Sequence, residues 1–279
     1  MLTEKRVEEL EKFATDIRIQ TIRQMETRGF GHMGGAMSIC DLLSVLYGEQ
    51  MKYDADNPEW EERDWLICSK GHAGPAVYAA LALKGFFPMD WLDTLNQPGT
   101  RLPSHCDHSK TPGIDVTTGS LGQGLACAVG MALAGKMNHK DYKVFSVVGD
   151  GEAQEGEIWE AANTAHKYQL DNLIVFMDYN GLQIDGPCDQ VMPNRDLGEK
   201  FRAFGFEVIE IDGHNMEEIC ATLEKCYASK NGKPKCIYAH TIKGKGVSFM
   251  ENSVSWHGVA PNEEEHAKAM QELQAQIIE

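Results

Sequence analysis

The chain has 279 residues, of which 42% are hydrophobic and 24% are charged, so it is long enough to bury a sizeable core. Its formal net charge of −16 disfavours non-specific binding to nucleic acid or to acidic membranes. An anionic ligand must therefore be held by a local group of donors, because the overall field repels it.

The sequence predicts a cytoplasmic protein without a signal peptide or membrane span. Residues 1–11 are charged and lack an apolar core. The least polar stretch, residues 125–135, is too short to cross a bilayer and is rich in Ala and Gly. The eight cysteines include no Cys-x-x-Cys pair, which fits reduced, mostly structural thiols.

Apolar runs of strand length alternate with helical patterns along the chain. In chain order the sequence predicts helices over 3–27 and 38–50, a strand over 65–68, helices over 75–84 and 122–136, a strand over 143–148, a helix over 158–168, a strand over 172–177, a helix over 196–204, a strand over 206–211, a helix over 216–229, a strand over 235–240 and a final helical segment. Buried β-branched strands joined by helices are typical of an α/β fold, a mainly parallel sheet with helices on both faces. One domain over residues 1–279 accounts for the whole chain.

Polar, glycine-rich residues follow several of these strands, at 69–72, 149–151, 178–181 and 241–246. In open parallel sheets, ligands bind outside the carboxyl ends of the strands. We therefore expect four loops on one edge of the sheet to carry the site.

The strongest local motif is Gly149-Asp150-Gly151, which connects a strand to a helix. Its glycines allow backbone N–H groups to approach a phosphate, and the following helix start adds partial positive charge. The segment up to Asn180 is long enough for a helix and a return strand, which places Asn180 beside Asp150. Their side-chain oxygens and the Leu182 carbonyl would form half of an octahedral Mg²⁺ shell, to be completed by diphosphate oxygens and water.

This strand-GDG-helix-strand-Asn-Gly arrangement resembles the thiamine-diphosphate motif shared by transketolases, decarboxylases and 2-oxoacid dehydrogenases. Further segments resemble the N-terminal half of transketolase in order and spacing, namely residues 31–35, 69–73, 117–124, 149–186, 241–246 and 256–258. The resemblance covers nearly the whole chain and implies the thiamine-diphosphate-binding fold, specifically its diphosphate-binding domain. Deoxyxylulose-phosphate synthase shares this ancestry, but residues 117–124 favour transketolase.

The resemblance implies ligands for both cofactors. Asp150, Asn180 and the Leu182 carbonyl would bind Mg²⁺, or Ca²⁺ or Mn²⁺ in its place. Leu121 and Ile184 would pack against the thiazolium ring. The full set expected to contact thiamine diphosphate is His72, Gly119, Leu121, Gly149, Asp150, Gly151, Glu155, Asn180, Ile184 and His257. Of these, Glu155 resembles the family's acidic residue at the contact with the pyrimidine-binding domain.

Three histidines resemble the family's catalytic residues, His32, His105 and His257, which would face the hydroxyl and carbonyl oxygens of the sugar. Histidine suits this role because it gives and takes protons near neutral pH. His108 is an alternative to His105, because the family usually shows Gly-His-Pro where this chain has residues 103–108. Zinc binding by residues 105–108 is a further alternative, although no second ligand pair is evident.

The remaining histidines, at 139, 166, 214, 240 and 266, are interpreted as surface or core residues. Lys243 and Lys245 are either solvated charges or part of a flexible loop near the anionic ligand.

In the family, a glutamate from a separate pyrimidine-binding domain activates the cofactor, and this chain has no candidate for it. The resemblance therefore implies a split transketolase that is active only with a partner subunit carrying the pyrimidine-binding and C-terminal domains, in an α2β2 assembly. It would transfer a two-carbon ketol unit from a ketose phosphate to an aldose phosphate. Three alternatives remain: a subunit of a deoxyxylulose-phosphate synthase or 2-oxoacid dehydrogenase, a non-catalytic regulatory subunit, and a truncated form of a full-length enzyme.

Overall fold

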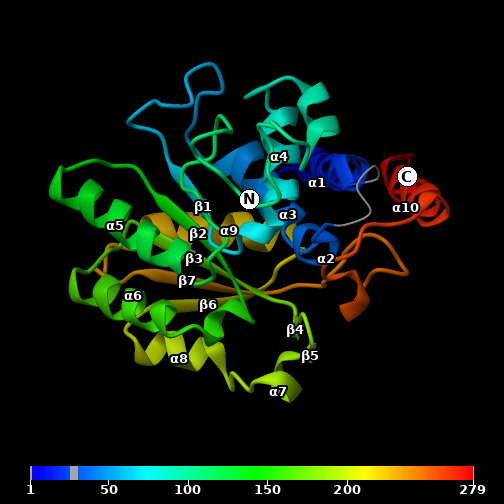
Figure 1. The fold of residues 1–279 in the computed structure, drawn as a ribbon. Coiled ribbons are helices and arrows are strands. Elements are labelled where there is room, and N and C mark those ends of the chain that lie inside the picture. Colours follow the sequence, from blue (N-terminus) through cyan, green and yellow to red (C-terminus); the bar gives the residue numbers. More distant parts are fainter. Residues whose placement is uncertain (1, 26–30, 279) are drawn as a thin grey trace.

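A five-stranded parallel sheet forms the centre of the computed structural model, which describes residues 2–25 and 31–278. The strands run in the order β1-β2-β3-β7-β6 (Figure 1). Their bounds are Trp65–Cys68 for β1, Val144–Gly149 for β2, Leu173–Tyr179 for β3, Glu207–Asp212 for β6 and Lys235–His240 for β7. The predicted strands 65–68 and 235–240 are confirmed at both ends. The other three each begin one residue later than predicted and run one or two residues further.

Helices connect the strands, as the sequence pattern predicts. They are α1 (Glu4–Met25), α2 (Met33–Met37), α3 (Cys40–Val45), α4 (Gly74–Leu83), α5 (Gln123–Met137), α6 (Gly156–Lys167), α7 (Cys188–Val191), α8 (Leu197–Ala203), α9 (Met216–Ala228) and α10 (Glu263–Ile278). Residues 26 and 27 of the first predicted helix lie outside the described residues. None of the helices within residues 2–25 and 31–278 combines the length and the apolarity that crossing a bilayer requires.

The prediction of one continuous α-helix over 38–50 is wrong. Ile39 leaves helical geometry with φ −106° and ψ 6°, α3 begins at Cys40, and Leu46–Gln50 forms a π-helical turn. The wider turn is closed by the Met51 N–H, which donates to the Leu46 carbonyl at 2.8 Å. It brings Gly48 against α1, where a Cβ would lie only 2.6 Å from Leu10.

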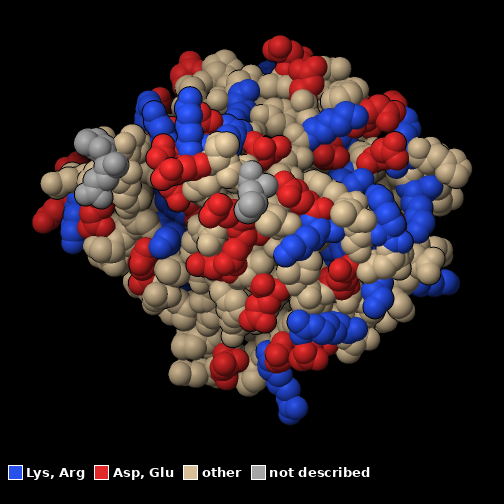
Figure 2. Space-filling view, turned by 180° about the vertical axis from the view of Figure 1, so that it is seen from behind, with Lys and Arg blue, Asp and Glu red and all other residues tan. Residues whose placement is uncertain are grey.

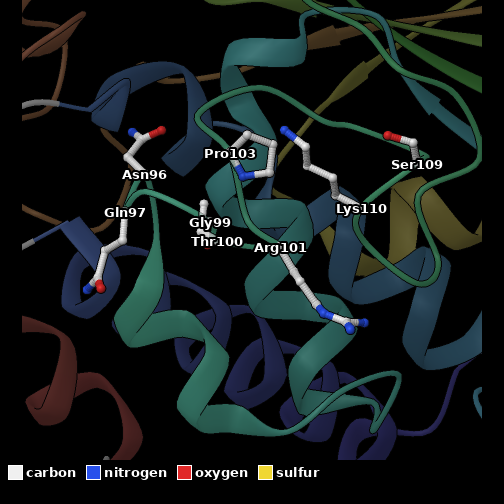
Figure 3. Close-up of a pocket in the computed structure, with 8 residues that line it drawn as sticks. All are labelled: Asn96, Gln97, Gly99, Thr100, Arg101, Pro103, Ser109 and Lys110. Carbon is white, nitrogen blue, oxygen red and sulfur yellow. The ribbon is translucent and has the colours of Figure 1, made fainter.

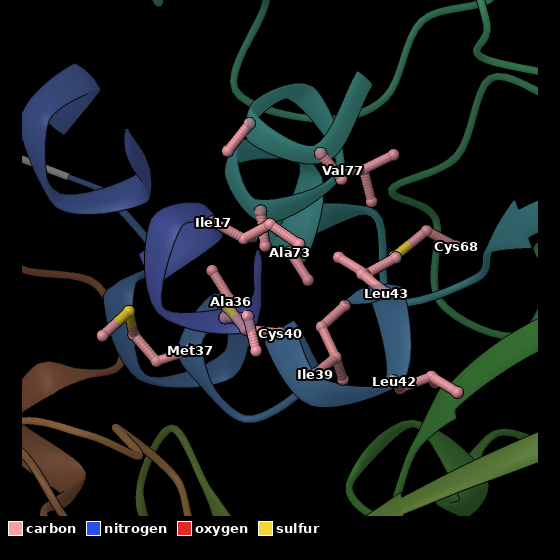
Figure 4. Packing of buried hydrophobic residues seen from close by; sticks show 14 of the residues in the cluster. Ile17, Ala36, Met37, Ile39, Cys40, Leu42, Leu43, Cys68, Ala73 and Val77 are labelled. Carbon is pink, nitrogen blue, oxygen red and sulfur yellow. The ribbon is translucent and has the colours of Figure 1, made fainter. Parts of the chain in front are cut away.

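Both faces of the sheet are covered by helices, and β3 shows how. Its side chains alternate, so that Ile174 and Phe176 pack into one core, while Leu173, Val175 and Met177 pack into the other. Helices α1, α3, α4 and α9 cover the first face, and α5, α6 and α8 cover the second (Figure 1). Figure 4 shows part of the first core, which includes Ile17 of α1, Leu43 of α3 and Val77 of α4.

A two-stranded antiparallel hairpin, β4 (Leu182–Gln183) and β5 (Gly186–Pro187), follows β3. The sequence pattern did not predict it, because each strand has only two residues. The hairpin and α7 project from the lower right of the sheet in Figure 1. On the face behind that view, acidic and basic side chains are interspersed (Figure 2).

Candidate active site

The loops after β1, β2, β3 and β7 meet at the carboxyl ends of the strands, around a cavity of about 370 Å³. This is the edge that the sequence predicts. All the predicted site residues line the cavity: His32, His72, His105, Gly119, Leu121, Gly149, Asp150, Gly151, Glu155, Asn180, Leu182, Ile184 and His257. The fold therefore brings together residues that lie far apart in the sequence.

Two glycines allow the loops to approach this closely. A Cβ on Gly71, after β1, would lie 2.7 Å from the backbone nitrogen of Gly119 and from the backbone carbon of Thr118. Gly119 itself has φ +137°, which L side chains rarely adopt, and a Cβ there would lie 2.9 Å from the His105 ring. The segment over 117–124 is thus fixed against the β1 loop.

Asp150 and the Asn180 loop are joined directly. The Asp150 carboxylate, only 2% exposed as a residue, accepts hydrogen bonds from the backbone N–H groups of Gly181 (2.5 Å) and Gly151 (2.8 Å). Burial, and next the nearby Asp178 carboxylate, raise the pKa of Asp150 to about 6. The Asn180 Oδ1 accepts a hydrogen bond from the Leu182 N–H at 3.1 Å. Carboxylate and amide oxygens are therefore held at one end of the cavity.

Four histidines form a cluster across the cavity. The ring centroid of His32 lies 5.3 Å from that of His72, 5.4 Å from that of His105 and 5.7 Å from that of His257. Burial lowers the pKa of all four: that of His72 lies well below its usual value, and that of His257 is lowered to about 4 with help from the Lys243 charge. All four rings are therefore neutral at pH 7.

His105, and not His108, lies in this cluster. The His108 Nδ1 pairs with the Ile114 carbonyl at 2.7 Å, and His108 does not line the cavity. The two residues between these histidines are also occupied elsewhere. Asp107 accepts a hydrogen bond from Ser109 Oγ at 2.7 Å, and Cys106 is buried in the hydrophobic core. The side chains of residues 105–108 therefore do not converge on a single point, as a zinc site would require.

Lys243 reaches into the cavity from the loop after β7. It is only 2% exposed, and its Nζ is hydrogen-bonded to His257 Nδ1 at 2.7 Å and to the Leu182 carbonyl at 3.3 Å. No carboxylate in the part of the chain that the structure describes forms an ion pair with it. Burial, and next the Lys70 charge, lower its pKa to about 8. Lys245, in contrast, has a 34% exposed side chain and pairs with Glu251 at 3.9 Å.

His214, which the sequence analysis set aside, holds the loop that carries Lys243. The Ile242 N–H donates to His214 Nε2 at 2.8 Å, so the ring proton lies on Nδ1 and is donated to Asp41 at 2.6 Å. Asp41 also pairs with Arg18. The role of His214 here is structural, in agreement with that interpretation.

Residues 10–276 match the protein family described as "Transketolase, thiamine diphosphate binding domain". The chain belongs to the transketolase family. The strand-end cavity therefore lies in a transketolase thiamine-diphosphate-binding domain, and the predicted fold is confirmed.

Several transketolases of this family are similar to the chain. It is 52% identical to the 6-deoxy-6-sulfo-D-fructose transketolase subunit SqwG of Clostridium sp., over 95% of the chain and 96% of that subunit. It is 42% identical to an apulose-4-phosphate transketolase subunit of Phocaeicola vulgatus, over 88% of the chain and 87% of that protein. The crystal structure of Campylobacter jejuni transketolase superposes with a TM-score of 0.88 at 32% identity, over 99% of the chain and 46% of that enzyme. The chain thus spans the length of the transketolase subunits but about half that of the solved transketolase.

Sequence reasoning missed three charged residues that line this cavity. Glu152 accepts hydrogen bonds from Ser69 Oγ (2.5 Å) and from the N–H groups of Gly122 and Gly149, and so ties three loops together. Lys70 and Asp178 form a buried ion pair at 2.5 Å. All three lie within predicted motifs, and a charge at the end of a buried strand was the signal that could have identified them.

A larger cavity of about 580 Å³ lies apart from these residues (Figure 3). It is lined by Asn96, Gln97, Gly99, Thr100, Arg101, Pro103, Ser109 and Lys110. None of the predicted site residues reaches it. The smaller strand-end cavity is therefore the candidate active site, because it holds the motif residues and the buried charges.

Proposed function

We propose that this chain is the diphosphate-binding subunit of a two-subunit transketolase that uses thiamine diphosphate and Mg²⁺. One observation carries the proposal: the Asp150 carboxylate is hydrogen-bonded to the loop of Asn180, in a cavity that also holds a buried lysine and four neutral histidines. Residues 1–279 would act as one diphosphate-binding domain. Since all eight cysteines are free thiols and seven of them are buried, we also propose a cytoplasmic location.

The residues present fit both cofactors. Asp150, Asn180 and the Leu182 carbonyl offer the oxygen ligands that Mg²⁺, or Ca²⁺ or Mn²⁺ in its place, prefers. Lys243 presents a buried positive charge without a carboxylate partner among the described residues, which suits a diphosphate. Gly151, His72 and His257, which are the other expected contacts of the diphosphate, line the same cavity.

The apolar rim of the cavity fits the thiazolium ring. Leu121 and Ile184 are 37% and 61% exposed, although both line the cavity. Large exposed apolar side chains at a cavity commonly mark a binding surface. We propose that the cofactor and the partner subunit cover them.

When bound, thiamine diphosphate supplies the nucleophilic carbon and the electron sink for cleavage of the sugar C2–C3 bond. The protein's part is to orient the sugar and to move protons. His32, His105 and His257 are neutral near pH 7 and therefore able both to accept a proton from a hydroxyl group and, once protonated, to return it.

The chain would need a partner to act. Similar proteins named as transketolase subunits have the length of this chain, which supports a split enzyme. The partner would carry the pyrimidine-binding and C-terminal domains, in an α2β2 assembly, and Glu155, which is exposed at the cavity rim, would contact it. Family membership favours this reading over the alternatives of a synthase, a dehydrogenase or a non-catalytic subunit.

The substrates would be sugars with a distal anionic group. A ketose phosphate donor and an aldose phosphate acceptor are the general transketolase substrates, and the apulose-4-phosphate enzyme supports a phosphate here. The 52% identity to the 6-deoxy-6-sulfo-D-fructose transketolase subunit favours a second candidate, a sulfonated ketose. Assays with each donor in parallel would decide between them.

The test mixes the purified chain with its partner, thiamine diphosphate and Mg²⁺, and follows two-carbon transfer by product analysis. We expect negligible transfer by the chain alone and robust transfer by the mixture. Turnover by the chain alone would refute the split site, and release of carbon dioxide from pyruvate would refute transketolase chemistry. If Asp150→Ala left the activity of the mixture unchanged, a non-catalytic role would be favoured. The exposed Asp56→Ala serves as the matched control.

A further inference from the structure

A single carboxylate connects four loops of the site. Asp178 is the penultimate residue of β3 and is only 2% exposed. Its Oδ2 accepts hydrogen bonds from Lys70 Nζ (2.5 Å), Ser38 Oγ (2.9 Å) and Asn180 Nδ2 (3.1 Å), and its Oδ1 accepts from Thr241 Oγ1 at 2.5 Å. The donors come from the α2–α3 turn and from the loops after β1, β3 and β7. Asp178 therefore holds these loops in register.

Lys70 acts on Asp178 rather than on the open cavity. Its ammonium group has three N–H donors, and they have three acceptors: the Gly35 carbonyl (2.6 Å), Ser38 Oγ (3.2 Å) and Asp178. The residue is 1% exposed. The buried ion pair with Lys70, at 2.5 Å, holds Asp178 as a carboxylate.

An ionised carboxylate fixes the orientation of the Asn180 amide. Asp178 accepts hydrogen bonds and cannot donate them, so the amide NH₂ of Asn180 must point toward it. The amide oxygen then lies at the other end of the group, on the side of Leu182. Without Asp178, only the hydrogen bond from the Leu182 N–H would favour this orientation over the flipped one, in which the NH₂ group faces the cation.

We propose that Asp178, held by Lys70, is a positioning residue that turns the Asn180 amide oxygen toward the metal ion. This inference rests on the proposed cofactor site and identifies residues that act through another residue. Partners that orient a metal ligand in this way typically change metal affinity by roughly 10- to 100-fold.

The experiment measures Mn²⁺ affinity by electron paramagnetic resonance, on the chain mixed with thiamine diphosphate and its partner subunit. In Asp178→Asn, the amide oxygen is uncharged and has only two lone pairs for the three donors Lys70, Ser38 and Asn180, so the hydrogen bond that fixes the Asn180 amide is weakened or lost. We expect its Mn²⁺ dissociation constant to rise by at least about 10-fold. Circular dichroism melting establishes that each variant is folded.

Two controls separate orientation from general stability. Ser38→Ala removes one hydrogen bond from the same carboxylate and leaves the Asn180 bond in place, so Mn²⁺ affinity should change by less than about twofold. Asp115→Asn weakens a comparable buried pair with Arg63, on the loop that precedes the site segment at 117–124. It should lower the melting temperature without changing Mn²⁺ affinity.

A double variant tests whether amide orientation alone explains the loss. Asp178→Asn combined with Asn180→Asp replaces the amide at position 180 by a carboxylate, which presents an oxygen to the metal in either orientation. We expect Mn²⁺ affinity within about threefold of the wild type. If Asp178→Asn alone does not fold, this variant decides: restored binding supports the inference, and binding 10-fold weaker than wild type contradicts it.

The outcomes separate the positioning role of Asp178 from the existence of the cofactor site. If the wild type binds Mn²⁺ and Asp178→Asn binds it with the same affinity, the positioning role of Asp178 is overturned and the proposed function stays intact. If the wild-type mixture bound no Mn²⁺ in the presence of thiamine diphosphate, the cofactor site itself would be wrong, and the inference with it.

Discussion

Replacing the buried Lys243 by methionine should stabilise the chain in the absence of cofactor. The side chain is 2% exposed, and no carboxylate of the described residues pairs with it. Its charge is therefore unfavourable in the folded state until an anion binds. Methionine has a similar length and carries no charge, so Lys243→Met removes the cost and retains most of the packing.

The size of this gain in stability follows from the pKa of Lys243, which burial lowers from 10.5 to about 8. Each pKa unit corresponds to about 1.4 kcal/mol, so the folded state loses roughly 3 kcal/mol at pH 7. A lysine whose pKa is lowered by folding destabilises the folded state by the full amount when the pH is below its folded-state pKa. The effect disappears as the pH rises to its unfolded-state pKa. The stability difference between variant and wild type should therefore fall from roughly 3 kcal/mol at pH 7 to about 1 kcal/mol at pH 10.

Urea unfolding of the chain without cofactor, at pH 7 and at pH 10 under reducing conditions, measures this difference. Lys245→Met is the matched control, because Lys245 lies on the same loop with a 34% exposed side chain. It should change the free energy of unfolding by less than about 0.5 kcal/mol. Calorimetry on the mixed subunits should show weaker thiamine diphosphate binding for Lys243→Met only.

Lys243→Met should therefore raise the stability of the cofactor-free chain and lower its affinity for thiamine diphosphate. A Lys243→Met variant that is less stable than wild type at pH 7, or a stability difference that does not shrink at pH 10, would refute the interpretation of Lys243 as an uncompensated buried charge. Equal cofactor affinity would show that the charge serves another ligand.

Three further predictions concern the cavity. Asp150→Ala should lower two-carbon transfer by the mixed subunits more than about 100-fold in a steady-state assay, because a ligand contributes more than its supporting residues do. Gly71→Ala should cost about 1–3 kcal/mol in urea unfolding, since the new methyl would lie 2.7 Å from backbone atoms, whereas Gly130→Ala, with nothing within 4 Å, should not destabilise. Ile184→Asp should weaken thiamine diphosphate binding about 10-fold by calorimetry at unchanged melting temperature, because the side chain is 61% exposed before the cofactor covers it. The packing described would be contradicted if Gly71→Ala had the same free energy of unfolding as the wild type, or if Ile184→Asp had a lower melting temperature.

The parts of the site that depend on local pattern were predictable from the sequence. Strand patterns place Asp150 and Asn180 at neighbouring strand ends, and parallel sheets bring such ends together. The predicted edge and the pairing of Asp150 with Asn180 follow from those two rules, whereas the other site residues came from the resemblance to transketolase. Apart from the predicted helix over 38–50, which is broken, the described helix and strand boundaries shift by only a residue or two.

The parts that depend on long-range partners were not predictable. Lys70 and Asp178 are separated by 108 residues, and nothing in either segment indicates that they pair. Lys243 gave no sign of whether its side chain is solvated or buried, because this depends on Gly34, whose missing Cβ leaves room for it. The choice of His105 over His108 depends in the same way on Gly119 and on the Ile114 carbonyl.

A crystal structure of the chain with its partner, thiamine diphosphate and Mn²⁺ would locate the metal by its anomalous signal. We expect one strong peak in contact with the oxygens of Asp150 and Asn180, with the diphosphate beside it and next to Lys243. A metal peak outside the strand-end cavity, or a diphosphate that does not reach Asp150, would contradict this expectation.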